Sequence, residues 1–184
     1  SRPSGRCSRT SRGCPPSGGV GGFSVFLCGG SNIGAGITNG DLDYVDGQIL
    51  GEVEHGGGVW ANIDLQARYQ ASGTEDFSGS GSITTIAPLE VTDFAGYTLF
   101  LGVGASITGT ITAFELDELT ANIPLEMHKD GTKTIEATLN GNYKHSELNF
   151  SGEGSVTVVK QITIAEGVGS KGYSFYLEPS SGVS

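Results

Sequence analysis

The sequence predicts an all-β fold: a single antiparallel β-sandwich or β-barrel with a disordered or extended N-terminal tail. The first observation is a repeated segment, Y-Q-A-S-G-T-E-D-F-S-G-S-G-S-I-T at 69–84 and Y-K-H-S-E-L-N-F-S-G-E-G-S-V-T at 143–157. The second is the strict alternation after each Phe, which is typical of a strand with two unlike faces. The third is the absence of a sustained helical period, which disfavours a parallel βαβ architecture.

Length and composition predict one domain with many turns. The chain has 184 residues, of which 36% are hydrophobic and 31 are glycine. That length is enough for a sizeable core, and the apolar residues fall in alternating runs as folded β-strands require. We expect a tail rich in Arg, Gly, Ser and Pro at 1–22, an antiparallel β domain at 23–178 and a C-terminal tail at 179–184.

The strand candidates are justified by alternation and by the turn signals between them. They are 23–28, 42–45, 48–54, 58–69, 77–86, 89–92, 96–103, 105–115, 119–128, 133–139, 142–150, 151–159, 161–165 and 172–177. Turns are predicted at Asn39-Gly40, Asp46-Gly47, Gly56-Gly57-Gly58, Asp130-Gly131 and Asn140-Gly141, because such pairs supply the positive φ of tight hairpins. Asn140-Gly141 gives the clearest hairpin signal. The segment 112–120 fits either a short helix or a strand.

Internal duplication is a further hypothesis. Ala61-Asn62-Ile63 precedes the first copy of the repeat, and Ala121-Asn122-Ile123 precedes the second with about fourteen more residues between. An antiparallel unit copied once, with an inserted hairpin, explains this spacing. Chance matching in a sequence rich in Gly and Ser is the alternative.

The strands have one apolar face interrupted by glycine and one face of small hydroxyl residues. In the second copy Phe150, Gly152, Gly154, Val156 and Val158 alternate with Ser151, Glu153, Ser155 and Thr157. Glycine inside a strand loses packing, so we expect something to fill the space. The candidates are an aromatic ring from Trp60, Phe94, Tyr97 or Phe100, a sharp curvature of the sheet, or a bound apolar ligand.

Charge is distributed unevenly along the chain. The first 20 residues contain four arginines and no acid, so the remaining residues carry 6 basic and 20 acidic side chains, a net charge of −14. An acidic body repels phosphates, so nucleic acid is an unfavourable partner except through the N-terminal arm. That arm is either an RNA-binding element or a plain low-complexity tail.

The cysteines are Cys7, Cys14 and Cys28, all of them before the repeated segments. Cys7 and Cys14 are spaced so that they could pair within the arm, and an odd count leaves one thiol over. The apolar run 23–28 is too short to span a bilayer as a helix, so no transmembrane helix is predicted.

Acidic residues at 39–47 form the densest group of oxygen ligands. Asn39, Asp41, Asp43 and Asp46 alternate around glycines in a way that suits a hard cation such as Ca²⁺. The spacing is not that of an EF-hand, since Tyr44 stands where that loop has its glycine. A solvated acidic turn is the alternative interpretation.

Catalytic motifs are missing from the sequence. It has no G-x-S-x-G elbow and no phosphate-binding loop, and Glu115, Asp117 and Glu118 form an acidic group without a companion motif. The sequence therefore leans away from an enzyme. An enzyme on a jelly-roll-like sandwich is one alternative function, and a self-assembling coat or fibre subunit that uses its edge strands and N-terminal arm is another.

The favoured function is that of a secreted or surface β protein binding an apolar small molecule or lipid in a Gly-lined interior. Apolar burial drives such binding, with few polar groups needed. A homo-oligomer is compatible with this function, and Ca²⁺ is the one candidate cofactor. The residues expected to line the interior are Trp60, Phe77, Ile83, Tyr97, Phe100, Ile111, Phe150 and Val156.

Overall fold

The computed structural model describes residues 19–20, 22–73, 75–168, 173–180 and 182–183. These residues form β-strands joined by tight turns, with one short 3-10 turn, η1 (His145–Glu147). All strands pair in antiparallel fashion, which confirms the predicted all-β antiparallel fold. The strands are β1 (Gly19–Val20), β2 (Phe23–Leu27), β3 (Asn32–Thr38), β4 (Asp41–His55), β5 (Gly58–Gln70), β6 (Asp76–Thr85), β7 (Leu89–Phe94), β8 (Tyr97–Leu101), β9 (Ser106–Thr112), β10 (Glu115–Lys129), β11 (Thr132–Lys144), β12 (Asn149–Val158), β13 (Ile162–Val168), β14 (Tyr173–Leu177) and β15 (Gly182–Val183).

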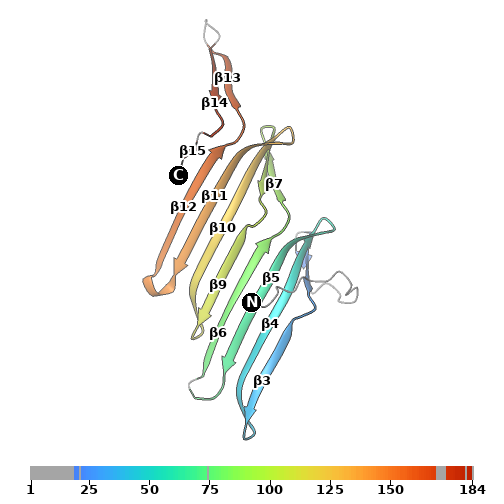
Figure 1. The fold of residues 1–184 in the computed structure, drawn as a ribbon, viewed down its shortest axis with the longest axis vertical. Helices are drawn as coiled ribbons and strands as arrows, with labels where there is room; N and C mark the ends of the chain where they lie inside the picture. The colour runs from blue at the N-terminus through green and yellow to red at the C-terminus, as the bar shows by residue number, and fades with distance from the viewer. Residues whose placement is uncertain (1–18, 21, 74, 169–172, 181, 184) are drawn as a thin grey trace.

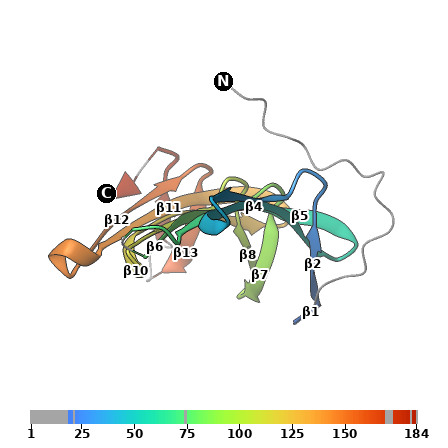
Figure 2. The ribbon, with the colours of Figure 1, turned by 90° about the horizontal axis from the view of Figure 1, so that it is seen from below.

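One large sheet contains β1 to β12 and β15. Its strands follow the order β1-β2-β4-β5-β6-β9-β10-β11-β12-β15, while β3 also pairs with β4 and β8 also pairs with β10. Figure 1 shows this sheet as a long oblique array from β3 to β12, with the separate β13–β14 hairpin beyond its end. Seen along its plane the array is a single layer from which β1, β2, β7 and β8 turn to one side (Figure 2). A large antiparallel sheet of this kind is compatible with a sandwich or barrel-like fold.

Two of the predicted turns lie inside strands. Asp46 of β4 is paired with Gly34 on one side and Arg68 on the other, so 42–45 and 48–54 form one strand. Asn140 of β11 is likewise paired with Asn122 and Glu153, which makes the hairpin prediction at Asn140-Gly141 wrong. A dipeptide signal is local, whereas strand neighbours on both sides satisfy the backbone of these residues and hold them extended.

The other turn signals behave as their chemistry predicts. Asn39 and Gly40 have φ of 55° and 93°, and Asp130 and Gly131 have φ of 50° and 72°. Gly56-Gly57 also turns at positive φ. The ambiguous segment 112–120 contains a turn at Ala113-Phe114 followed by the start of β10, so it is not helical. Strand β3 was not predicted, because N-I-G-A-G-I-T has little side-chain mass to signal a strand.

The sheet is built from two copies of one structural unit. We call β1–β6 the first unit and β7–β12 the second. Strand β2 pairs with β4 from Phe23↔His55 to Leu27↔Gly51, and β8 pairs with β10 from Tyr97↔Lys129 to Leu101↔Leu125, so both partners are displaced by 74 residues. The same displacement relates the β3–β4 pairing to the β9–β10 pairing.

Irregularities in the strands repeat with the same displacement. The register shifts at Gly36/Ile37 in the β3–β4 pairing and at Leu116/Glu118 in the β9–β10 pairing, where the strands skip Asp43 and Asp117. The β4–β5 and β10–β11 pairings shift at Val53/Glu54 and Met127/His128. Because bulges are specific features of a strand, their coincidence confirms an internal duplication.

The structure also corrects the sequence evidence for that duplication. The Tyr-to-Thr segments do occupy equivalent places, in β5–β6 and in β11–β12. Ala61-Asn62-Ile63 lies on β5, however, while Ala121-Asn122-Ile123 lies on β10, the counterpart of β4. That second match is therefore a coincidence of composition, and no inserted hairpin is needed.

The end of the described chain resembles the beginning of a third unit. Val183 pairs with Val156 as Ile107 pairs with Ile83. The Ser180 amide donates to the Val158 carbonyl at 2.8 Å, as the Gly104 amide donates to the Thr85 carbonyl at 2.9 Å. The β13–β14 hairpin then takes the place in chain order that β7–β8 has in the second unit.

Few side chains are buried in this arrangement. Apart from the glycines at 51 and 102, the buried residues in the described part of the chain are Cys28, Val53, Ala61, Thr85, Ala105, Thr134 and Val158. Several of them lie where a unit meets the linker into the next: the Thr85 amide donates to Ala105, and its hydroxyl donates to the Gly102 carbonyl. Cys28 is disulfide-bonded, and Cys7 and Cys14 lie outside the described residues.

Candidate functional site

The two faces of the sheet differ sharply in chemistry. Directly paired residues share a face, so the register places side chains in rows across the strands. One row runs Ile49–Leu65–Gly81–Gly109–Leu119–Tyr143–Phe150, and the next runs Gly51–Ile63–Ile83–Ile107–Ala121–Gly141–Gly152. We call the side that carries these rows the apolar face. The predicted segregation of aliphatic residues and glycine from hydroxyls is therefore confirmed.

The opposite face, which we call the polar face, is mainly hydrophilic in the same strands, with Leu50 and Pro124 as exceptions. One of its rows runs Gln48–Gln66–Ser80–Thr110–Glu118–Lys144. Asn122 and Asn140 join their side-chain amides at 2.6 Å, and Asn142 donates to Glu118 at 2.8 Å. A hollow of about 750 Å³ lies over this face, but its lining is polar and charged.

Leucines lie over several glycines of the apolar face. A Cβ built on Gly81 would stand 2.6 Å from Leu65 Cδ2, and one built on Gly154 would stand 3.0 Å from Leu139 Cδ2. These are equivalent pairs in the two units. In the second unit the ring of Phe150 lies beside Gly141 and Gly152. The aromatic residues expected in this role, Trp60, Phe94, Tyr97 and Phe100, are not the nearest neighbours of these glycines.

An apolar hollow remains where the two units meet. Gly79 and Gly81 of β6 lie beside Gly109 of β9, and the space over them is about 410 Å³. Its walls contain no charged residue. Its lining includes Leu65, Ala67, Phe77, Gly79, Gly81, Ile83, Ile107, Gly109, Ile111 and Leu116, and we call it the apolar hollow.

Three of the eight residues expected to line an interior lie in the apolar hollow: Phe77, Ile83 and Ile111. Phe77 is held at the end of the hollow by Phe114, whose ring centroid is 5.8 Å away. Phe150 and Val156 lie on the same face in the second unit, on β12.

The remaining three predicted residues lie away from the apolar hollow. Trp60 contacts the ring of Phe23 at 5.4 Å, and its Nε1 is buried without a hydrogen-bond partner. Tyr97 lies under Lys129, and Phe100 packs against His128 at 4.8 Å. Leu65, Ala67 and Leu116 line the hollow but were not predicted. The alternation 61-63-65-67 on β5 was the available signal for the first two.

No protein-family model, curated protein or solved structure matches the chain.

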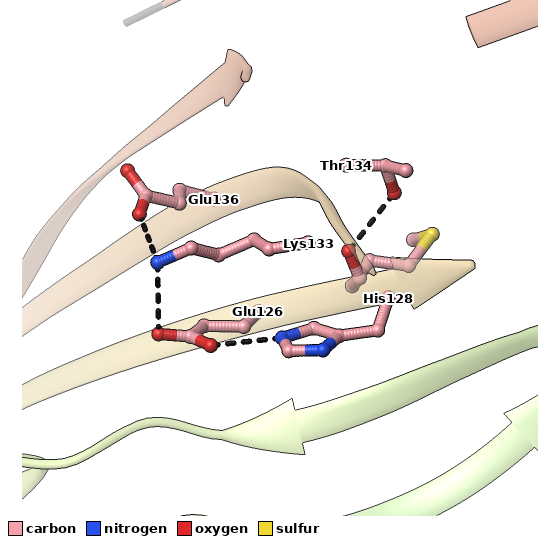
Figure 3. A network of polar contacts seen from close by, with 6 residues as sticks. Glu126, His128, Lys133, Thr134 and Glu136 are labelled. Atoms are coloured by element: carbon pink, nitrogen blue, oxygen red, sulfur yellow. Dashed lines mark hydrogen bonds and ion pairs between the residues drawn. The ribbon is translucent and has the colours of Figure 1, made fainter. Parts of the chain in front are cut away.

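A network of charged side chains lies outside the apolar hollow, on β10 and β11 (Figure 3). The Glu126 carboxylate contacts His128 Nε2 at 2.9 Å and Lys133 Nζ at 3.2 Å, and Lys133 also contacts Glu136 at 2.5 Å. Hydrogen bonds from His128 and Lys133 lower the pKa of Glu126 despite its partial burial. The two carboxylates raise the pKa of Lys133. The network pairs charged side chains of β10 with Lys133 and Glu136 of β11, so it joins the two strands.

The acidic residues suggested for calcium lie around the β3–β4 hairpin. Asn39 is in the turn, and Asp41, Asp43 and Asp46 are on β4. The Asp43 carboxylate accepts a hydrogen bond from Thr38. Within the described residues, no group of three or more His, Cys, Asp and Glu side chains is placed to hold a metal ion. Calcium binding at this hairpin stays a prediction.

The acidic residues at 115–118 lie at the start of β10 and have different partners. Glu115 contacts His145 Nε2 at 3.2 Å, whereas Glu118 accepts from Asn142. Asp117 is the residue skipped at the bulge.

No helix in the described part of the chain has the length and hydropathy to cross a membrane.

Proposed function

We propose that this chain is a non-catalytic protein that binds an apolar small molecule or a lipid chain on the apolar face of its sheet. The observation that carries the proposal is the apolar hollow, where three glycines leave about 410 Å³ between aliphatic and aromatic walls. A space of this size holds a ligand of a few tens of atoms or part of an acyl chain. Removing both surfaces from water drives the binding.

The surroundings of the hollow support an uncharged ligand portion. Its lining has no cation to pair with an anionic group, and the chain has a formal net charge of −10. Large apolar patches that are exposed on a protein surface generally mark binding sites. Ile83, Ile107 and Leu65 are all exposed on this face, although each is a residue type that normally lies in a core.

A secreted or surface location is part of the same proposal. Cys28 is disulfide-bonded, and disulfides persist in oxidising compartments such as the cell exterior. An extracellular carrier of apolar molecules needs no catalytic residues, in keeping with the absence of a catalytic motif from the sequence.

The proposal is tested with the neutral dye Nile red and with palmitate, measured by fluorescence titration and by native mass spectrometry. Gly109→Val adds a side chain to the floor of the hollow, where the nearest atom to a Cβ would be Leu119 Cδ1 at 3.4 Å. We expect this variant to bind at least tenfold more weakly, because the ligand loses the space. Thr108→Val, on the same strand and the opposite face, is the matched control and should bind normally.

Two binding results would count against the proposal. If neither probe binds saturably to the unmodified chain, and natively purified protein carries no apolar molecule, the hollow is not a ligand site. Equal loss of binding in Gly109→Val and Thr108→Val would count against this location.

A further inference from the structure

The two outer edges of the sheet are complementary to each other. At one end the outer strand is β3, the counterpart of β9 in the second unit. At the other end the last long strand is β12, the counterpart of β6 in the first unit, and β15 pairs with two of its residues. Within the chain, β6 and β9 pair directly and join the two units. The molecule therefore has a counterpart of β9 at one edge and a counterpart of β6 at the other, and these two strands already pair with each other within the chain.

The in-chain pairing supplies the register for a second one. On the apolar face, Gly79, Gly81 and Ile83 oppose Ile111, Gly109 and Ile107. The equivalent residues at the outer edges are Gly152, Gly154 and Val156 on β12 and Ile37, Ala35 and Ile33 on β3. We propose that β12 of one copy pairs with β3 of a second copy in this register, so that copies join head to tail.

The sequences at both edges match the pairing that they would repeat. Strand β12 carries the same S-G-x-G-S motif as β6. Strand β3 carries isoleucine at both positions where β9 does, and alanine where β9 has Gly109. The edge of β12 therefore presents to β3 nearly the same small-residue surface that β6 presents to β9.

The exposure of the isoleucines shows what a partner would cover. Ile33 and Ile37 of the outer strand β3 are 80% and 68% exposed. Their equivalents Ile107 and Ile111, which have β6 beside them, are 46% and 36% exposed. A neighbouring strand thus removes a substantial part of the exposed surface of each isoleucine, and this burial favours pairing. An unpaired edge also offers free backbone groups to another chain.

Strand β15 occupies part of the same edge. It pairs with β12 only at Val156 and Thr157, the positions that would receive Ile33 and Asn32 of the second copy. In the described part of the chain, the rest of β12 has no strand on that side. Strand β15 pairs with two residues of β12, whereas a seven-residue β3 would pair with more of it. We therefore expect β15 to give way, and its removal to strengthen the assembly.

The head-to-tail geometry has a consequence for size. The β3 edge and the β12 edge are different surfaces. An assembly of any number of copies therefore keeps a free β3 edge at one end and a free β12 edge at the other. The series of oligomers has no fixed end point, in contrast to a symmetric dimer formed through the apolar faces. The inference concerns the edges alone and does not depend on the apolar hollow binding a ligand.

The experiment is sedimentation velocity from about 1 to 200 μM on the lipid-extracted full chain. We expect dimers, trimers and larger species that increase with concentration. The double variant Ile33→Lys/Ile37→Lys should weaken association at least tenfold, because it places two charges at the pairing edge. Both side chains are exposed in the single copy, so folding should be unaffected, as checked by circular dichroism. Val103→Lys, at an exposed apolar residue of the β8–β9 linker, is the control.

Mixing two blocked variants tests the head-to-tail polarity. The Ile33→Lys/Ile37→Lys chain keeps a free β12, and a Val156→Lys chain keeps a free β3. Each should be monomeric alone, and an equal mixture should give a dimer and nothing larger. A chain ending at Glu178, which lacks β15, should associate at least tenfold more tightly than the full chain.

Amide hydrogen exchange on the unmodified chain gives a readout that needs no variant. Amides of β3 and β12 should become more protected as the concentration rises. A full chain and a chain ending at Glu178 that both stay monomeric at 200 μM would overturn the inference. So would a dimer that is unaffected by the edge variants, since that result would place the contact on the apolar face.

Discussion

Gly79 and Gly81 lie two residues apart on β6 and face the same hollow, yet a methyl group on each would meet a different obstacle. At Gly79 a Cβ would lie 2.8 Å from the Gln66 carbonyl oxygen, which belongs to the backbone of a paired strand. At Gly81 the obstacle is Leu65 Cδ2, the free end of a flexible side chain. A backbone atom moves only if the strand moves, whereas a leucine can change rotamer.

Gly79→Ala should therefore destabilise the protein by about 1–3 kcal/mol, the usual range for overpacking. Gly81→Ala should change stability by less than about 1 kcal/mol, since the loss of unfolded-chain freedom offsets part of the contact. Urea unfolding of the two variants measures the difference. Equal losses of stability in the two variants would mean that the paired backbones of β5 and β6 can move apart to make room for the methyl group at Gly79.

The Glu126 network makes a second residue-level prediction, on pH. Because its pKa is lowered in the folded state, mainly by the hydrogen bond with His128, the Glu126 carboxylate stabilises the fold above its ordinary pKa of about 4.5. That contribution is lost as the pH falls through the lowered value. Glu126→Gln should therefore cost about 0.5–1 kcal/mol at pH 7, the scale of a partly exposed ion pair, and progressively less in acid.

Glu52 provides the matched control for this pH effect. It occupies the equivalent position on β4, but Glu54 and Val59 stand where the second unit has His128 and Lys133. Glu52→Gln should leave stability at pH 7 almost unchanged. Thermal unfolding of both variants between pH 3 and pH 8 tests the comparison, and a constant cost of Glu126→Gln across that range would contradict it.

At the scale of the element, strands were predictable wherever the side chains alternate clearly. The predicted strands 58–69 and 77–86 match β5 and β6 within one residue at each end. Strand β3 was missed because glycine at positions 34 and 36 removes the alternation, and only its pairing with β4 makes it extended. Tertiary pairing also overrode the Asn140-Gly141 signal. Local chemistry predicts a turn only where no neighbouring strand competes for the backbone.

The sequence predicted that the candidate site is apolar, but it predicted only some of the residues that line the apolar hollow. The sequence shows which residues alternate with glycine on β6 and β9, so Phe77, Ile83 and Ile111 were accessible to reasoning. It does not show which strands become neighbours. Phe100 was expected in the interior because it is aromatic, but β8 pairs with the far end of β10, beside Glu126. Which of the other predicted residues lie in the apolar hollow depends on the strand order, which is set by pairings between residues distant in sequence.

At the scale of the whole molecule, the duplication explains how so few buried side chains support so large a sheet. The two units meet through the β6–β9 strand pairing, the ring contact of Phe77 with Phe114 and the linker at Thr85. Stability in such an array is approximately the sum of unit and junction terms. Strands with a neighbour on both sides therefore contribute more to the stability of the sheet than strands at an edge.

Hydrogen exchange should reveal this gradient along the chain. Among the described strands, β13 and β14 pair only with each other, whereas β5, β6, β10 and β11 each lie between two strands of the large sheet. An isolated hairpin is marginally stable in water. We therefore expect amides of 162–168 and 173–177 to exchange at least a hundredfold faster than those of the four central strands, because the hairpin can open without disturbing the sheet. Native-state exchange followed by NMR or mass spectrometry measures this ratio at a concentration of a few micromolar. Protection of the hairpin equal to that of β5 and β6 would show instead that it opens only with the whole sheet, and the additive description of the units would then fail.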